Sequence, residues 1–214
     1  MHTVNKFFTK IDGGEVYLEG LLEIPQTSRI PPCVVMCHPD PRNGGNMFNN
    51  VLNGVSQALH SNGIATLRFN FRGVGDSTGE FEGGNSEVTD AISVLTHASV
   101  LSTIDGSRIG VMGYSFGAGI ALESTITSDI VRAVVSISCP QRHFSTFGTV
   151  EILQPKLLIC GDRDHDFPAS QFDFLSGRFT KPCQSEIITG ADHFFRGHES
   201  ILGNLTSDFF SGIL

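Results

Sequence analysis

The sequence predicts an α/β protein with a doubly wound, mostly parallel sheet and antiparallel strands at its N-terminal end. Short apolar runs alternate along the chain with segments whose apolar residues recur at helical spacing, and the runs end in polar or glycine-rich loops. This alternation is typical of parallel strands joined by helices that cover both faces of a sheet. Because no linker, repeat or large inserted cap is evident, we expect a single domain over residues 1–214.

The composition indicates a chain that folds on its own. Its 214 residues are 40% hydrophobic and 17% charged, which suffices to bury a core without disulfides. A net charge of −8 with no cluster of basic residues argues against nucleic acid as a partner. No apolar run is long enough to span a bilayer and the first residues lack the pattern of a signal peptide. We therefore expect a cytoplasmic protein with no membrane partner.

The cysteines agree with a reducing compartment. Five is an odd number, and most of them lie in or beside apolar runs, as reduced buried thiols do. Their spacing contains no paired metal-ligand motif, so we expect neither a metal nor a cofactor. Cys37 beside His38 could be reactive, but a packed thiol at a strand end is the simpler interpretation. The sequence specifies no oligomeric state.

The first half of the chain predicts strands at its start and then alternation of strand and helix. Apolar residues on either side of the turn 12–14 are typical of an antiparallel hairpin. Helical spacing further along predicts a helix that Asn46 caps and Asn62 ends. The predicted elements are a hairpin over 7–11 and 16–24, a strand over 32–37, a helix over 47–60, a strand over 64–71 and, after a glycine-rich loop over 72–84, a second helix.

The second half continues the same alternation. We expect a strand and helix joined at 113–117, strands over 133–137 and 156–160, a phenylalanine-rich helix over 168–179, a strand over 186–188 and a final helix over 199–210. The segment 140–155 shows no clear helical period and offers the room for a small lid.

The junction at 113–117 carries the main functional signal. Gly113-Tyr114-Ser115-Phe116-Gly117 places a serine between a strand and a helix, which is the layout of a nucleophile elbow. A turn this tight needs neighbours without bulk two residues to either side of the serine, and Gly113 and Gly117 meet that need. The N-terminus of the following helix would favour an oxyanion beside Ser115.

The Gly-x-Ser-x-Gly pattern occurs a second time, at 75–79 around Ser77. Here the preceding strand has already ended, and the residues that follow are a poor helix start. Context therefore favours Ser115 as a nucleophile and Ser77 as a loop serine, with a structural turn serine as the alternative for Ser115.

A nucleophilic serine needs a histidine base and a carboxylate that orients it. In a strand-to-helix elbow fold the acid follows a later strand and the histidine comes after the acid. The loop after 156–160 offers Asp162, Asp164 and Asp166, and Asp164 is favoured because the acid should reach inward past a completed turn; Asp162 could instead tie down the turn. Chain order leaves His193 and His198, and His193 is nearer to a strand end.

The oxyanion hole follows by elimination. One donor would be the backbone N–H of Phe116, directly after the nucleophile. The second should come from the loop after 32–37, where Pro39 and Pro41 have no N–H to give, so Asp40 is left between them. The alternative is that the two prolines only stiffen the loop.

Several stretches together resemble a known family, the small, cap-less, dienelactone-hydrolase-like branch of the α/β-hydrolases. The resemblance covers nearly the whole chain and implies the α/β-hydrolase fold, no large cap and a triad of Ser115, Asp164 and His193. The choice of Asp164 over Asp162 rests more on this resemblance than on turn geometry. Two departures, Asp40 where the family often has a second histidine and Ser115 where dienelactone hydrolases proper have cysteine, count against dienelactone itself as substrate. The matching stretches are 37–41, 44–47, 67–77, 113–117, Gly161 with Asp164, and 192–195.

These residues lead us to expect a serine hydrolase of the carboxylesterase type that cleaves small esters, or related acyl substrates, through an acyl-enzyme on Ser115. A peptidase or acyltransferase on the same triad is one alternative, and a non-catalytic binding protein that kept the fold is another. The expected partner is a small-molecule acyl substrate. The residues expected to line its pocket are His38, Arg42, Asn46, Tyr114, Phe144, Phe147 and Phe194, and Asn43 is a further candidate. The alternative for Arg42, Asn43 and Asn46 is that they are only polar loop residues, and for the phenylalanines that they belong to the core.

Overall fold

The computed structural model describes residues 3–214, and the elements seen there follow the predicted alternation. Within this range eight strands form one sheet: β1 (Val4–Asp12), β2 (Tyr17–Pro25), β3 (Cys33–Cys37), β4 (Ala65–Phe69), β5 (Ile109–Tyr114), β6 (Val131–Ile137), β7 (Lys156–Gly161) and β8 (Cys183–Ile188). The α-helices of the same range are α1 (Asn50–Ser61), α2 (Asn85–Ser99), α3 (Phe116–Thr127), α4 (Gln141–Phe147), α5 (Ala169–Ser176) and α6 (Glu199–Ser211).

The strand order is β1-β2-β4-β3-β5-β6-β7-β8. The hairpin β1–β2 joins the sheet through an antiparallel pairing of β2 with β4, and the pairings from β4 to β8 are all parallel. The loops that follow the parallel strands therefore meet at one edge of the sheet, where ligands bind in open α/β folds. The predicted fold class is confirmed.

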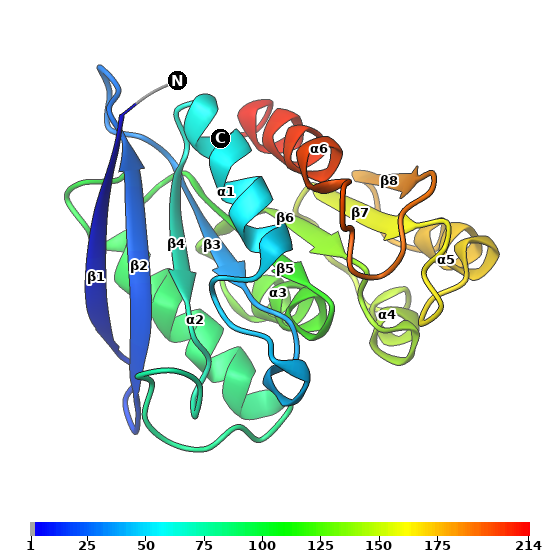
Figure 1. Cartoon of the computed structure of the whole chain (residues 1–214), viewed down its shortest axis with the longest axis horizontal. Helices are drawn as coiled ribbons and strands as arrows, with labels where there is room; N and C mark the ends of the chain where they lie inside the picture. The colour runs from blue at the N-terminus through cyan, green and yellow to red at the C-terminus, as the bar shows by residue number, and fades with distance from the viewer. Residues whose placement is uncertain (1–2) are drawn as a thin grey trace.

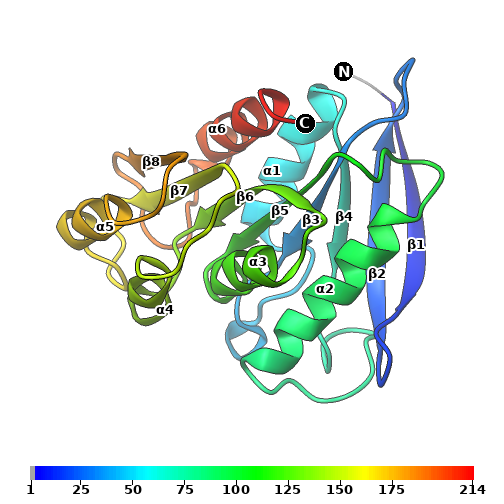
Figure 2. The same cartoon turned by 180° about the vertical axis from the view of Figure 1, so that it is seen from behind.

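Helices cover both faces of the sheet. In Figure 1, α1 and α6 lie together on the near face, and Figure 2 shows α2 and α3 on the opposite face. Each face has its own core: apolar residues of the strands pack with α1 and α6 in one cluster and with α2 and α3 in the other. The central strands β3, β4 and β5 are buried along their whole length, which is why β3 is a continuous apolar run; β4 also buries Thr66 and Arg68.

The start of α1 differs from the prediction. The helix begins at Asn50 with Asn49 as its N-cap, whereas the Asn46 side chain accepts from Phe48 N in the preceding loop. The backbone of Met47 is held outside the helix because its N–H donates to Asn70 Oδ1 (2.8 Å) and its carbonyl accepts from Arg68 (3.1 Å). Long-range hydrogen bonds thus override the local capping signal.

The segment 140–155 contains a helix that the sequence did not reveal. α4 starts after Pro140 and has seven residues, too few for a helical period to be recognised. Its buried residues Phe144 and Phe147 face the core, and α4 packs against α3 and α5. No large cap interrupts the strands of the described chain. Across 3–214, no helix has both the length and the apolar character needed to cross a membrane.

Candidate active site

Ser115 lies at the junction of β5 and α3 in a conformation that few residues adopt. Its φ of 54° is in the left-handed region, as expected for a strained nucleophile elbow. A Cβ at Gly113 would collide with the carbonyl of Gly117, and a Cβ at Gly117 would collide with the carbonyl oxygens of Cys37 and His38. Both glycines are required by close approach, and the second draws α3 against the end of β3.

Ser115, His193 and Asp164 form one hydrogen-bonded chain. His193 Nε2 is 3.0 Å from Ser115 Oγ, and His193 Nδ1 is 3.0 Å and 3.1 Å from the two carboxylate oxygens of Asp164. Asp164 follows β7 and is buried, whereas His193 follows β8 and is partly exposed. The Tyr114 hydroxyl donates to the carbonyl of His193 (2.7 Å) and so fixes the backbone that carries the imidazole.

The electrostatics of the pair favour a proton on the imidazole. Burial raises the pKa of Asp164, but the hydrogen bond and charge of His193 outweigh it and hold that pKa below its ordinary value. Burial likewise lowers the pKa of His193, and the hydrogen bond and charge of Asp164 outweigh it, so the pKa of the imidazole lies above its ordinary value. Asp164 therefore stabilises the imidazolium that forms when His193 accepts a proton.

Two backbone N–H groups beside Ser115 are free to meet an anion. Within the described chain, neither Phe116 N nor Asp40 N donates to another protein atom. The other polar groups of Asp40 are engaged: its carbonyl accepts from Asn43 N (3.0 Å) and Gly45 N (3.1 Å), and its carboxylate pairs with Arg42 (2.6 Å). The negative charge of Asp40 is thus compensated by Arg42 while its N–H stays available.

The competing residues of the sequence have structural contacts instead. The Asp162 side chain accepts from Gly190 N (2.7 Å) and ties the loops after β7 and β8 together. Ser77 is buried, donates to the carbonyl of Asn70 (2.8 Å) and accepts from Glu19 N (2.9 Å). His198 is the N-cap residue of α6 and lies outside the triad.

A hollow of about 540 Å³ opens over Ser115. Of the predicted pocket residues, Tyr114 and Phe194 line it, as do Asp40 and His193. Asn43, named as a possible pocket residue, lines it too. Sequence reasoning missed four residues of its polar wall, although Asp166 and Arg196 lie only two or three residues from Asp164 and His193 and could have been found by that proximity. The missed residues are Asn49, Asn50, Asp166 and Arg196.

The prediction that Phe144, Phe147 and His38 line the pocket is wrong, because their side chains point into the core. Phe144 is 1% exposed and stacks with other phenylalanines at centroid distances of 4.8–5.5 Å. Phe147 belongs to the same buried cluster. His38 is fully buried, and both of its ring nitrogens bond to the backbone. Strand-end and helix positions alone did not reveal the direction of these side chains.

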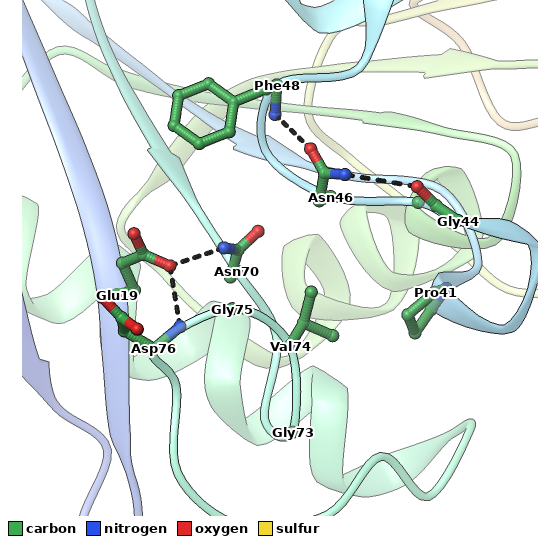
Figure 3. Close-up of a pocket in the computed structure, with 11 residues that line it drawn as sticks. Glu19, Pro41, Gly44, Asn46, Phe48, Asn70, Gly73, Val74, Gly75 and Asp76 are labelled. Atoms are coloured by element: carbon green, nitrogen blue, oxygen red, sulfur yellow. Dashed lines mark hydrogen bonds between the residues drawn. The ribbon is translucent and has the colours of Figure 1, made fainter.

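Arg42 and Asn46 also lie outside the hollow over Ser115. Arg42 is exposed, pairs with Asp40 and lies over the ring of Phe81 (5.4 Å). Asn46 lines a second hollow of about 530 Å³, which shares Gly44 and Gly45 with the first as lining residues. Figure 3 shows residues that line this second hollow, with the Asn70 side chain donating a hydrogen bond to Glu19.

The sequence matches a family model and is similar to known proteins. The model of the PET hydrolase-like family matches residues 74–201, more than half of the chain. An uncharacterized protein of Rickettsia prowazekii is 34% identical over 180 residues, 79% of this chain and 74% of its own length.

Solved structures show the same fold over almost the whole chain. An α/β serine hydrolase homologue from Coxiella burnetii has a TM-score of 0.84 and 30% identity, covering 97% of both chains. A dienelactone hydrolase from Anabaena variabilis has a TM-score of 0.84 over 100% of both chains, and at 23% identity this likeness shows the fold alone. The chain belongs to the PET hydrolase-like family of α/β-hydrolases, and it shares its fold with dienelactone hydrolase, as the resemblance in the motifs predicted.

Proposed function

We propose that the protein is a serine hydrolase that cleaves small carboxylic esters through an acyl-enzyme on Ser115. Membership of a hydrolase family supports hydrolase activity in general. The observation that carries the finer proposal is the hydrogen-bonded chain from Ser115 Oγ through His193 to Asp164, with 3.0 Å between Oγ and Nε2. A binding protein that had only kept the fold would not need these three side chains in contact.

In the first half-reaction Ser115 Oγ attacks the carbonyl carbon of the ester while His193 Nε2 takes the hydroxyl proton. The carbonyl oxygen becomes an oxyanion that faces the free N–H groups of Phe116 and Asp40. His193 then returns the proton to the alkoxy oxygen, the C–O bond breaks and the alcohol leaves. The acyl group remains bonded to Ser115.

Water completes the reaction by the same route. His193 takes a proton from a water molecule as its oxygen attacks the acyl carbon, and a second oxyanion forms at the same two N–H groups. His193 gives the proton back to Ser115 Oγ when the C–O bond to the serine breaks. The products are a free carboxylic acid and the regenerated hydroxyl.

The hollow over Ser115 supports a small substrate, or one end of a larger one. Its walls are loops without a cap, and Phe194, 56% exposed, offers an apolar surface beside polar asparagine side chains. A small-molecule acyl compound is therefore the proposed partner. A cytoplasmic location is also part of the proposal, supported by five cysteines that are all free thiols.

A panel of nitrophenyl esters with short and long acyl chains tests this function. The wild type should hydrolyse the shorter esters, and Ser115→Ala should lower kcat by about 10³-fold or more because the nucleophile is gone. Ser77→Ala is the matched control, since it removes the serine of the other Gly-x-Ser-x-Gly sequence, and it should keep activity of the wild-type order. Equal activity of wild type and Ser115→Ala would rule the proposal out.

A further inference from the structure

We infer that His38 is a positioning residue that aims the Asp40 N–H into the oxyanion hole by holding the carbonyl of Pro39. This inference rests on the proposed function, because it concerns an oxyanion formed at Ser115. His38 contacts neither the triad nor the hollow over Ser115, so it acts only through the peptide group between Pro39 and Asp40.

The contacts of His38 are specific at both ring nitrogens. Nδ1 lies 2.7 Å from the carbonyl oxygen of Pro39, and Nε2 lies 3.1 Å from the backbone N of Phe71. The ring also packs edge-on against Phe71, with 4.6 Å between the ring centres. The imidazole thus joins the end of β3 to the loop after β4.

These contacts determine the tautomer. A backbone N–H can only donate, so Nε2 accepts from Phe71 and carries no proton. The proton is then on Nδ1, where it donates to Pro39. Complete burial lowers the pKa of His38 to about 4, so the ring is neutral whenever His193 can act as a base.

The held carbonyl belongs to the peptide whose N–H is the proposed oxyanion donor. A trans peptide is planar, and its C=O and N–H point in opposite directions. Fixing the Pro39 carbonyl toward His38 therefore fixes the Asp40 N–H on the opposite side, at the hollow that Asp40 and Ser115 both line. The peptide that follows is held separately, because the Asp40 carbonyl accepts from Asn43 and Gly45.

Among the described residues, His38 is the one hydrogen-bond donor to the Pro39 carbonyl. Pro39 has no N–H of its own, and the Asp40 carboxylate is occupied by Arg42. Preorganised donors are what give an oxyanion hole its effect, because no reorganisation is then needed as the charge develops. A rotated Pro39–Asp40 peptide would present its carbonyl, with the wrong sign of charge, to the oxyanion.

Two substitutions separate positioning from packing. In His38→Asn the amide nitrogen takes the place of Nδ1 and can still donate to Pro39, but the acceptor for Phe71 is lost. In His38→Gln the side-chain oxygen takes the place of Nε2 and accepts from Phe71, but the donor to Pro39 is lost. Each variant keeps one of two buried hydrogen bonds and leaves a cavity, so both should lower the Tm.

The kinetic effects should differ between the variants. His38→Gln should lower kcat by about 10- to 100-fold with KM nearly unchanged, because a misaimed donor weakens only the transition state. Binding of a trifluoromethyl ketone, which forms an oxyanion on Ser115, should weaken by the same factor. His38→Asn should keep kcat within about threefold of the wild type, since its donor to Pro39 remains. Equal kinetic losses in both variants, or full activity of His38→Gln, would overturn the inference.

The wild-type protein offers a test that does not depend on how a variant folds. Long-range ¹H–¹⁵N spectra should show His38 protonated at Nδ1 in the free protein, with this proton shifting when the trifluoromethyl ketone binds. A proton on Nε2, or no response to the ketone, would overturn the inference while ester hydrolysis stayed intact. Absence of hydrolysis by the wild type would instead overturn the proposed function and this inference with it.

Discussion

At the scale of single residues, Asp164 sets the behaviour of His193. Burial alone lowers the pKa of the imidazole, and the carboxylate of Asp164 at 3.0 Å raises it above the ordinary value. Because His193 must be neutral to accept the Ser115 proton, kcat/KM should increase as the pH rises through the pKa of His193. The acid limb of the profile should therefore have its midpoint above about 6.5, the ordinary histidine value.

Asp164→Asn should lower kcat by about 10³- to 10⁴-fold, since the imidazolium loses its stabilising charge and the ring its tautomer. The remaining effect of burial should move the acid limb to lower pH. Rate profiles between pH 5 and 9 measure both changes. Asp162→Asn serves as the control, because that exposed side chain holds Gly190 instead of His193, and its midpoint should match the wild type. A midpoint that stays in place in Asp164→Asn would contradict the assigned role.

At the scale of elements, the site depends on how closely α3 approaches β3. Gly117 touches the carbonyl oxygens of Cys37 and His38, and this contact brings the N-terminus of α3 beside the loop that carries Asp40. The loop is also fixed from the other side, because Met47 is held between Arg68 and Asn70. The two oxyanion donors thus come from separate elements whose spacing one glycine controls.

Gly117→Ala should destabilise the protein by about 1–3 kcal/mol, because its methyl group meets backbone that cannot move aside. It should also lower kcat, since any backbone movement that relieves this clash separates the N–H groups of Phe116 and Asp40. Gly119→Ala in the same helix is the matched control: its methyl group meets only the His143 side chain, at 3.0 Å, and alanine favours the helix. Urea unfolding and ester hydrolysis give the two readouts. A Gly117→Ala variant as stable and active as Gly119→Ala would contradict this account.

At the scale of the whole molecule, the arrangement of strands was predictable and the surroundings of the site were less so. Chain order and local sterics suffice to place Ser115 at a strand-to-helix turn and His193 after a later strand, whereas the choice of Asp164 over Asp162 rested more on the family resemblance than on turn geometry. The structure brings these three side chains into contact. The direction of His38 and Phe144 could not be read in this way, since it depends on partners distant in sequence, such as Phe71 and Phe179.

Contacts between residues distant in sequence also explain why the start of α1 was predicted at the wrong residue. Asn46 is a good capping residue in isolation, but Met47 is hydrogen-bonded to Arg68 and Asn70, and the chain forms a turn at 47–48 before the helix starts after Asn49. Arg68 lies on β4 and Asn70 follows it directly, and β4 pairs with β3 only once the sheet has formed. Tertiary contacts decided these details, whereas the alternation of strands and helices was decided locally.

The most direct test of the central claim is covalent labelling of the intact protein with a fluorophosphonate, followed by mass spectrometry of its peptides. The wild type should gain one label, on the peptide that contains Ser115, because His193 activates that hydroxyl alone. Ser115→Ala should remain unlabelled and Ser77→Ala should be labelled as the wild type is. An unlabelled wild type, or a label that persists in Ser115→Ala, would contradict the assignment of Ser115 as the nucleophile.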